Sequence, residues 1–501
     1  MRASGILMHI SSLPNACGIG KLGREAYDFV DFLEKASQTY WQVLPVSPTS
    51  YGDSPYQSFS VFAGNPYFID FKTLENDGLL KASEYESVNW GTDLECVDYG
   101  LLYKNIFPVL KKAYARFKKS PESGYEAFLS QNGWLDDYAL FMSLKFAHNG
   151  AAWYEWEEPL RLYKADAVSR ARLKYADDIG FWKFLQYEYF KQWNALKKYA
   201  NEKGIKIIGD IPIYVALDST EVWTRPELFM LDSDKRPTFV AGCPPDCFSP
   251  LGQLWGNPLY RWDEMECDGY SWWISRIAFA AKVYDKIRID HFRGFDSFYA
   301  IPYGSADATV GEWKQGAGMK LFKAVKQSLG EIDVIAEDLG FITKSVERLL
   351  KRSGYPGMKV LEFAFDKSGE SVYLPHNFKD KNCVVYTGTH DNETLGGWVK
   401  SQSRADLAFC REYLGVKRNR DIPWAMLRLA WSSIADTAIA QMQDFLELDN
   451  CARMNTPSTL GGNWTWRMKY GAASDALAQK IARLTKTYGR TPNKPNERTK
   501  R

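Results

Sequence analysis

Acidic residues lie within or at the ends of five short apolar runs of this chain. They are Asp210 in GDIPIYV, Asp290 in RIDHFRG, Glu337 in AEDLG, Asp366 in FAFD and Asp391 in THDNET. A single residue of this kind is commonly a helix cap or an exposed charge at a strand end. That explanation fails for the set, because uncompensated like charges repel when they are packed on one edge of a sheet. The set therefore indicates a functional site.

Two kinds of chemistry use such a cluster of carboxylates. A pair of carboxyl groups flanking a bond is the usual means of glycosidic cleavage, with one group as nucleophile or base and the other as acid. An oxygen-rich Mg²⁺ or Ca²⁺ site is the alternative. Arg288 and Arg293 flank Asp290 and would repel a cation, and the chain contains neither a HExxH zinc motif nor a P-loop. We therefore expect glycosidic chemistry without a metal or other cofactor.

The overall composition restricts the kinds of partner. The 501 residues include 63 Lys and Arg against 61 Asp and Glu, so no global field attracts nucleic acid or an acidic membrane surface. Aromatic residues make up 15% of the chain, and several lie in the Gly- and Pro-rich stretch 248–262. There a flat apolar ring with a polar edge would suit a sugar, with core packing as the alternative. We expect a neutral ligand.

The cysteines and the N-terminal segment bear on the compartment. The eight cysteines lack the spacing of a secreted disulfide framework, and Cys243 and Cys247 are wrongly spaced for a zinc ribbon. The N-terminal segment lacks the apolar run of a signal peptide, and no stretch approaches a membrane span. We expect a cytoplasmic protein with reduced thiols and no membrane partner. The oligomeric state is not predicted.

Eight short apolar runs predict the elements that position these residues. They are GILMHI (5–10), WQVLPV (41–46), IKIIGDIPIYV (205–215), DKIRID (285–290), DVIAE (333–337), MKVLEFAF (358–365), CVVYTG (383–388) and MQDFLEL (442–448). Runs without polar alternation are typical of strands buried on both faces of a parallel sheet. Eight of them predict an α/β fold, a (β/α)₈ TIM barrel whose catalytic residues lie at the carboxyl ends of the strands.

Two intervals are too long for barrel connections. Apolar residues recur at helical spacing over 102–117 and 185–200, so the interval of about 47–204 predicts an inserted, mainly helical subdomain. A loop-rich insertion is expected at about 216–284. Together with the barrel these form a catalytic unit over 1–490, and the basic, pattern-free segment 491–501 is expected to be a disordered tail.

Nine motifs, taken in order along the chain, resemble those of the amylomaltase family. These enzymes are the 4-α-glucanotransferases, also called disproportionating enzymes, and are related to the α-amylases. The motifs are GILMHISSLPNACGIGKLG, DSPYQSFSVFAGNPYFID, GDIPIYV, PPDCFSPLGQLWGNPLY, RIDHFRG, AEDLG, FAFD, THDNET and ARMNTPST with the following GNWTWR. The resemblance covers nearly the whole chain.

The resemblance implies an activity and three catalytic residues. A segment of an α-1,4-glucan or maltooligosaccharide would pass to the 4-hydroxyl of an acceptor glucan or glucose, with retention through a covalent glucosyl-enzyme. Asp290 matches the nucleophile, Glu337 the acid/base, and Asp391 the carboxylate that holds the 2- and 3-hydroxyls. An α-amylase-type retaining hydrolase would use the same carboxylates and stays an alternative. The intact carboxylates argue against an inactive glucan-binding protein.

The resemblance also implies a set of substrate-binding residues. Arg288 should orient Asp290 and keep it ionised, since a nearby cation lowers the pKa of a carboxyl group. Further sugar contacts are expected from His291, His390, Asp210, Asp366, Tyr56 and Ser54, and from Asp246, Phe248, Gln253 and Trp255 in a loop over the acceptor side. Cys247 replaces an aromatic residue frequent in the family, which leaves the preferred chain length open. His9 could reach the pocket or bind a loop carbonyl.

Overall fold

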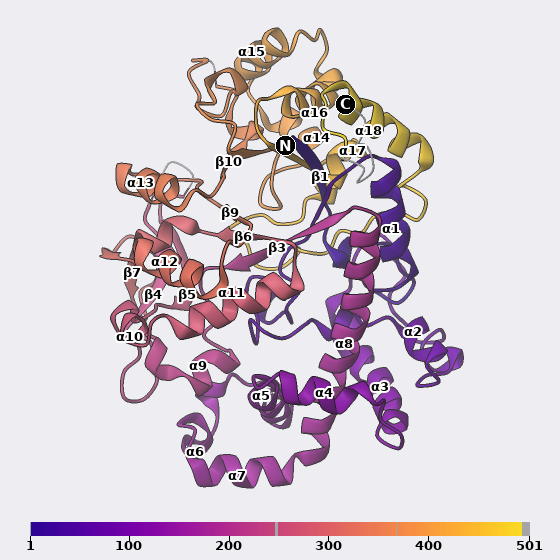
Figure 1. Cartoon of the computed structure of the whole chain (residues 1–501), viewed down its shortest axis with the longest axis vertical. Coiled ribbons are helices and arrows are strands. Elements are labelled where there is room, and N and C mark those ends of the chain that lie inside the picture. Colours follow the sequence, from indigo (N-terminus) through magenta and orange to yellow (C-terminus); the bar gives the residue numbers. More distant parts are fainter. Residues whose placement is uncertain (1, 246–248, 367, 493–501) are drawn as a thin grey trace.

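Eight parallel strands form a closed barrel (Figure 1). The computed structural model describes residues 2–245, 249–366 and 368–492. Around the barrel the strands are β10 (Gly357–Val360), β11 (Cys383–Tyr386), β12 (Thr437–Gln441), β1 (Ala3–Leu7), β2 (Tyr40–Gln42), β3 (Lys206–Pro212), β6 (Lys286–Asp290) and β9 (Val334–Ala336). The Ala336 N–H donates to the Pro356 carbonyl at 2.9 Å and joins β9 to the start of β10. The predicted (β/α)₈ barrel is confirmed.

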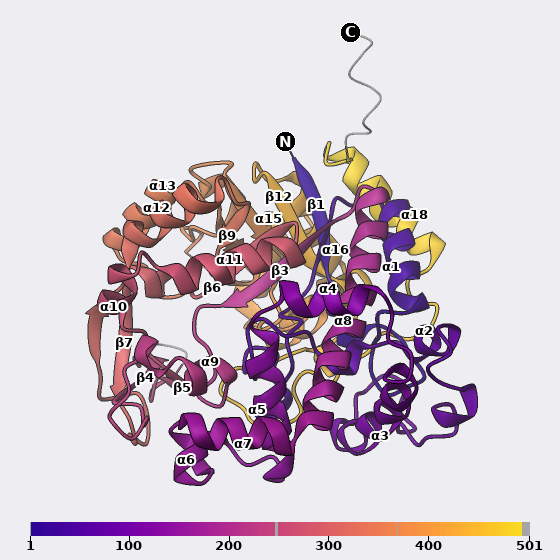
Figure 2. The ribbon, with the colours of Figure 1, turned by 60° about the horizontal axis from the view of Figure 1, so that its bottom comes forward.

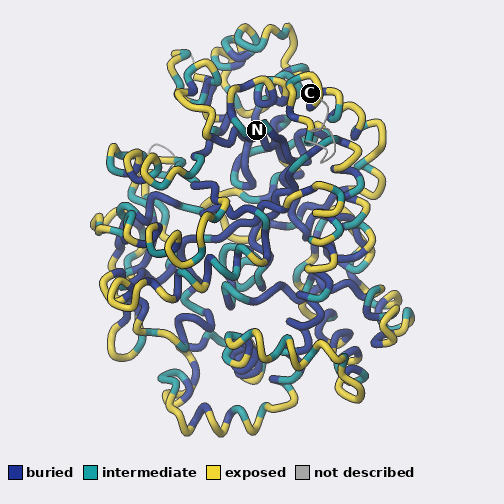
Figure 3. Tube along the Cα trace, in the orientation of Figure 1, coloured by how far each residue is buried: buried dark blue, intermediate teal, exposed yellow. Residues whose placement is uncertain are grey.

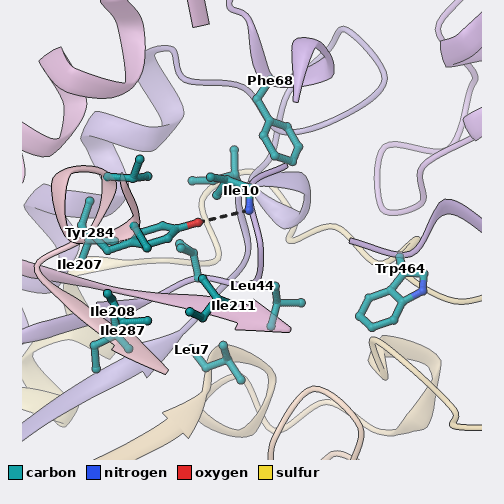
Figure 4. Close-up of a cluster of buried hydrophobic side chains, with 14 of the residues drawn as sticks. Leu7, Ile10, Leu44, Phe68, Ile207, Ile208, Ile211, Tyr284, Ile287 and Trp464 are labelled. Atoms are coloured by element: carbon teal, nitrogen blue, oxygen red, sulfur yellow. Dashed lines mark hydrogen bonds between the residues drawn. The ribbon is translucent and has the colours of Figure 1, made fainter. Parts of the chain in front are cut away.

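The barrel strands are short and closely packed. All residues of β1 and β12 are buried, as expected for strands covered on both faces. A side chain at Gly5 is excluded, because its β-carbon would lie 2.6 Å from the β-carbon of Tyr40 on β2. Figure 4 shows Leu7, Ile208 and Ile287, from three strands, within one apolar cluster. The sheet is therefore a filled core that supports the site at its carboxyl-terminal end.

The eighth strand lies earlier than the sequence predicts. The predicted run 442–448 is not a strand, because it begins with the helix α17 (Met442–Phe445), directly after β12. Short apolar runs do not distinguish a strand from a buried helical turn. Here the Asp444 carboxylate accepts the backbone N–H of Leu395 at 2.8 Å, a contact that holds this turn inside the protein.

Helices surround the barrel (Figure 1 and Figure 2). Outside the two long intervals they are α1 (Arg24–Lys35), α12 (Gly318–Leu329), α13 (Lys344–Ser353), α14 (Leu395–Ser401), α15 (Arg404–Leu414), α16 (Ile422–Ser432) and α18 (Asp475–Thr487). α13 begins where the Thr343 side chain accepts the Val346 N–H, and it ends at Gly354 with φ 75°. Over the described residues, no helix has the length and apolar character needed to cross a membrane.

The interval between β2 and β3 is helical, as its periodicity predicts. It contains α2 (Phe71–Asn76), α3 (Tyr99–Phe117), α4 (Gly124–Gln131), α5 (Leu135–Ala147), α6 (Glu158–Arg161), α7 (Ala165–Lys174) and α8 (Ala176–Glu202). The predicted helical repeats over 102–117 and 185–200 fall within α3 and α8. Figure 3 shows the central strands buried, whereas the outer helices at the bottom of the view are largely exposed.

A second, antiparallel sheet lies beside the barrel and was not predicted. Its strands, in order, are β5 (Gln253–Pro258), β4 (Phe239–Cys243), β7 (Ser297–Pro302) and β8 (Glu312–Gln315). The expected loop-rich interval 216–284 supplies two of these strands and the helices α9 (Thr220–Thr224), α10 (Trp262–Cys267) and α11 (Ser271–Val283). The Gly and Pro residues in QLWGNP indicate turns, yet an edge strand tolerates them. Figure 1 shows this sheet at the left side of the molecule.

The end of the described chain is bound to the barrel. The Arg490 guanidinium donates to the carbonyls of Trp431 at 2.8 Å, Ala3 at 2.9 Å and Ser433 at 3.1 Å. Arg490 is therefore part of the folded unit. The predicted tail begins just after it, and residues 493–501 lie outside the described part of the chain.

Candidate active site

Arg288 bridges two acidic residues at the carboxyl-terminal ends of neighbouring strands. Its Nη1 lies 2.6 Å from Asp210 Oδ2 and 3.0 Å from Asp290 Oδ1. The register explains the first contact, because Asp210 on β3 is paired with Arg288 on β6. Asp290 lies two residues further along β6 and therefore on the same face. Its side chain is 29% exposed, whereas Asp210 and Arg288 are buried, so Asp290 is the group accessible to a ligand.

The charge state of Asp290 depends on opposing influences. Burial raises the pKa of its carboxyl group, and Asp210, Glu337 and Asp391 raise it further. The guanidinium of Arg288 acts in the opposite direction and lowers the pKa of Asp290. Arg288 is therefore the group that favours the ionised, nucleophilic form.

Backbone hydrogen bonds hold both carboxyl oxygens of Glu337. Oε2 accepts the N–H of His291 at 2.7 Å, and Oε1 accepts the N–H of Leu339 at 2.8 Å. His291 follows β6 directly with φ 52°, a left-handed conformation that turns the chain. The next N–H, of Phe292, donates to the Glu337 carbonyl at 3.0 Å. The loops after β6 and β9 are thereby joined, and they bring Asp290 and Glu337 into one site.

The proton affinities in this part of the site suit acid catalysis. Burial raises the pKa of Glu337, and Arg288 and the two backbone donors oppose that rise. A carboxyl group with a raised pKa can donate a proton near neutral pH. Burial, with a smaller effect from Arg293, lowers the pKa of His291 to about 3. A neutral imidazole both donates and accepts hydrogen bonds, which suits sugar hydroxyls.

A tight turn after β11 presents Asp391. The turn is fixed by Asn392, whose Oδ1 accepts both the backbone N–H and the hydroxyl of Thr389 at 2.9 Å. Asp391 Oδ1 accepts a hydrogen bond from Asn455 Nδ2 at 2.6 Å, and the Asp391 carbonyl accepts one from Arg453 Nη2 at 2.6 Å. One segment near the end of the chain therefore holds both the side chain and the backbone of Asp391.

Tyr56 connects this turn with the cluster around Arg288. Its hydroxyl donates to Asp210 Oδ2 at 2.8 Å, and its ring stacks on His390 with centroids 4.9 Å apart and planes inclined by 17°. His390 Nε2 lies 3.4 Å from Asp391 Oδ1, and burial lowers the pKa of His390 while Asp391 opposes this. Ser54 supports Tyr56, because its hydroxyl accepts the Tyr56 N–H at 3.2 Å. Four of the predicted binding residues thus meet around one carboxylate site.

The second sheet places Trp255 against the loop after β6. The rings of Trp255 and His291 meet edge to face, with centroids 4.8 Å apart, and Trp255 Nε1 donates to Gln253 Oε1 at 3.1 Å. Trp255 and its partner Gln253 therefore lie beside His291. Their contact with the acceptor stays a prediction. The other residues expected there, Asp246 and Phe248, and the divergent Cys247, lie outside the described residues.

Asp366 and His9 differ from the residues above. Asp366 is exposed, and its Oδ1 accepts the backbone N–H of Ser368 at 2.8 Å and the Ser368 hydroxyl, so no described hydrogen bond joins it to the other candidates. Its contact with sugar stays a prediction. His9 Nδ1 accepts the Leu44 N–H at 3.2 Å, so the loop group it binds is a donor and not a carbonyl. Its ring also lines a small cavity shared with His390.

Sequence reasoning missed Asn455 and Arg453. Both lie in ARMNTPST, one of the motifs that carry the resemblance, so their region was indicated but their roles were not. They follow the last strand by more than a turn, and a search of strand ends therefore passes over them. Among the described residues, no group of three His, Cys, Asp or Glu side chains is arranged to hold a metal ion.

Comparison with known proteins gives the family. The sequence profile described as 4-alpha-glucanotransferase matches residues 8–473. The chain belongs to the 4-alpha-glucanotransferase family. The family predicted from the nine motifs is thus confirmed, and with it the enzyme class, a glucanotransferase.

Similar proteins carry the same name over nearly their whole length. The 4-alpha-glucanotransferase of Clostridium butyricum is 49% identical, over 96% of this chain and 100% of that protein. The one from Streptococcus pneumoniae is 50% identical, over 98% and 97%, and the one from Thermus thermophilus is 47% identical, over 96% and 99%. These names favour transfer over the hydrolase alternative.

Solved structures agree with the fold. An amylomaltase from Streptococcus agalactiae, determined in complex with acarbose, superposes with a TM-score of 0.96 at 44% identity, over 98% of this chain and 100% of that one. An amylomaltase from Corynebacterium glutamicum has a TM-score of 0.75 at 16% identity, over 97% of this chain and 75% of that one. At this low identity the similarity shows a shared fold and nothing more.

Proposed function

We propose that this glucanotransferase moves a segment of an α-1,4-glucan to the 4-hydroxyl of an acceptor glucan or glucose, with Asp290, Glu337 and Asp391 as its working carboxylates. The observation that carries the assignment is the pair of joined loops in which Arg288 contacts Asp290 and the His291 N–H binds Glu337. The acarbose complex of the S. agalactiae amylomaltase supports a saccharide as the ligand of this site.

In the first step, Asp290 attacks the anomeric carbon of the donor sugar. The bond from that carbon to the bridging oxygen breaks, and Glu337 gives its proton to the departing 4-oxygen. The ionised state of Asp290 is supported by Arg288, which opposes the pKa rise that burial causes. The products are a glucosyl ester on Asp290 and a glucan shortened by the transferred segment.

In the second step, the 4-hydroxyl of the acceptor attacks the same carbon. Glu337, now ionised, accepts the hydroxyl proton, and the ester bond to Asp290 breaks. The carbon is inverted twice, so the α-configuration is retained. Because the bond made is of the same type as the bond broken, the reaction runs close to thermoneutral and redistributes chain lengths in both directions.

The cluster around Asp391 binds the reacting sugar. Asp391 is 46% exposed at its side chain and accepts a hydrogen bond from Asn455, so it offers oriented oxygens to the 2- and 3-hydroxyls. Tyr56, stacked on His390, supplies a flat wall at the same place. Hydrogen bonds that tighten as the sugar flattens in the transition state increase the rate rather than the affinity alone.

Transfer requires that the acceptor compete with water, which is near 55 M (order of magnitude). A transferase achieves this by holding the acceptor at a high effective concentration in a site from which water is displaced. Trp255 and Gln253, beside His291, supply an apolar face and a hydrogen-bonding group for that purpose.

A product profile from pure maltotriose tests the proposed function. We expect glucose plus a ladder of longer maltooligosaccharides, while the total number of reducing ends stays almost constant. A steady rise in reducing ends, with only glucose and maltose accumulating, would instead assign the site to a hydrolase. The Glu337→Gln variant serves as the control and should give neither pattern.

A further inference from the structure

Two exposed aromatic rings flank Arg293 beside the catalytic loops. Trp313, on the edge strand β8, is 42% exposed, and Phe341 is 70% exposed. The guanidinium carbon of Arg293 lies 4.0 Å from the ring centroid of Trp313 and 5.9 Å from that of Phe341. We refer to Trp313, Phe341 and Arg293 as the aromatic rim.

The aromatic rim is connected to both catalytic residues. Arg293 follows Asp290 by three residues, and Phe341 follows Glu337 by four. Four residues span at most about 14 Å, so the backbones of Arg293 and Phe341 both lie within a few sugar units of the bond that reacts. Arg293 Nη1 donates to the Phe341 carbonyl at 2.5 Å, which joins the two loops a second time.

Structural roles account for the rim only in part. The ring of Trp313 lies on Arg293 and also contacts Tyr299, with centroids 5.2 Å apart, and these contacts explain its orientation. The ring of Phe341 is mostly in water and gains little from a cation 5.9 Å away. Neighbouring exposed aromatic rings mark binding surfaces more often than isolated ones do.

The rim is also preorganised. Arg293 is buried, and its Nη2 donates to the Ser297 hydroxyl at 3.3 Å at the start of β7. A guanidinium held in this way fixes the ring that stacks on it, so little side-chain entropy is lost when a ligand covers that ring. The sheet that carries Trp313 on one edge strand, β8, carries on the other, β5, Trp255, which is proposed above to contact the acceptor.

We propose that the aromatic rim binds the acceptor glucan beyond the sugar at which the new bond forms. The apolar C–H face of a glucose unit would stack on Trp313, and that of a further unit on Phe341, while the sugar edges stay in water. This inference rests on the proposed function, since it extends the same site to a longer acceptor. It makes Trp313 and Phe341 determinants of the preferred acceptor length.

Acceptor length is the variable that tests the rim. Maltose and maltohexaose, each labelled at the reducing end, serve as acceptors, and amylose serves as the donor. The measured quantity is the amount of labelled product that is longer than the acceptor. For the Trp313→Ala/Phe341→Ala variant, the ratio of kcat/KM for maltohexaose to that for maltose should fall about five- to tenfold, the loss expected for an uncovered ring face. Trp313→Phe, which keeps a ring, should recover part of this ratio.

Tyr470→Ala is the matched control. Tyr470 is also an exposed aromatic residue, at 52%, and its described hydrogen bond is to Glu25, away from the rim. This variant should keep the parental ratio. An unchanged ratio in the rim variant, or equal losses with both acceptors, would overturn the proposal. Failure of the proposed function would show differently, as an active Glu337→Gln enzyme or as rising reducing ends.

Discussion

Asn455 donates its side-chain amide to Asp391 at 2.6 Å across 64 residues of sequence. Because Asp391 is proposed to hold the distorted sugar, this hydrogen bond should contribute more in the transition state than in the ground state. Asn455→Ala is expected to lower kcat about 100-fold with a smaller change in KM, as for other misplaced catalytic groups. Initial rates with maltotriose measure both constants.

Two further variants sharpen this prediction. Asn455→Asp places a second negative charge beside Asp391 and should lower kcat more than Asn455→Ala does. Asn419→Ala, at an exposed residue whose described partner is Arg411, is the control and should keep parental kinetics. If Asn455→Ala raises KM and leaves kcat unchanged, Asn455 binds substrate itself and does not position Asp391.

Replacement of either member of the catalytic pair should stop turnover without unfolding the protein. Asp290→Ala removes the nucleophile and Glu337→Gln removes the acid, so both rates with maltotriose should fall to background. Since burial raises the pKa of Asp290, its removal should leave Tm unchanged or higher. Thermal unfolding and circular dichroism check the fold.

Azide distinguishes the two roles. Added to Asp290→Ala, it should restore cleavage of an activated donor and yield the glycosyl azide of inverted configuration. Near-parental activity in Asp290→Ala or in Glu337→Gln would contradict the assignment of that residue.

The acid limb of the pH–rate profile should depend on Arg288. Ionised Asp290 is required, so activity falls as the pH falls through the pKa of Asp290. Arg288 lowers that pKa, and its loss in Arg288→Gln should therefore move the acid limb to higher pH. The profile of kcat/KM with maltotriose records the shift.

Lys286→Gln is the control for this shift. Lys286 lies on the same strand, but its ion pair is with Asp333 at 2.9 Å. It should leave the acid limb in place. An acid limb that stays fixed in Arg288→Gln as well would mean that another group controls it.

Metal removal should have no effect on the rate. The cation already beside Asp290 is Arg288, at 3.0 Å, which disfavours a metal ion at the same carboxylate. Prolonged dialysis against EDTA should leave the rate with maltotriose unchanged. A loss of activity that Ca²⁺ or another metal restores would show that the acidic cluster binds metal.

Arg490 should contribute to the stability of the fold, whereas the residues after it should not. Arg490→Ala removes the guanidinium that donates to the buried carbonyls of Ala3 and Ser433, and it leaves the Trp431 carbonyl with Arg2 as its remaining donor. It should destabilise the protein by about 2–4 kcal/mol. Truncation directly after Arg490 keeps these hydrogen bonds and should leave the free energy of unfolding, measured with denaturant, unchanged. A large loss of stability on truncation would show that residues 491–501 dock on the fold.

The barrel was predictable because most of its strands lie in short runs rich in apolar residues. Parallel strands buried on both faces leave that pattern in sequence, and acidic residues at their carboxyl ends, such as Asp290 and Glu337, stand out against it. The run at 442–448 was wrongly predicted as a strand. The strand before it, TAIAQ, has Ile439 as its one bulky apolar residue, so a pattern of bulky apolar residues does not indicate it.

Other features depend on contacts that no local pattern contains. Asn455 reaches Asp391 only because the chain returns to the barrel mouth after its last strand. The second sheet pairs β4 with β7 across more than 50 residues, and neither strand alternates clearly enough to predict the pairing. The left-handed turn at His291, which brings its N–H to Glu337, is likewise visible only in the backbone.

The pairing of β1 with β12 has a consequence for synthesis of the chain. Ala3 to Leu7 pair with Thr437 to Gln441, so β1 gains this neighbour only after about 430 further residues have been synthesised. At roughly 5–20 residues per second this takes on the order of 20–90 s. During that time β1 presents an unpaired, apolar edge, and premature pairing with another nascent chain would begin there.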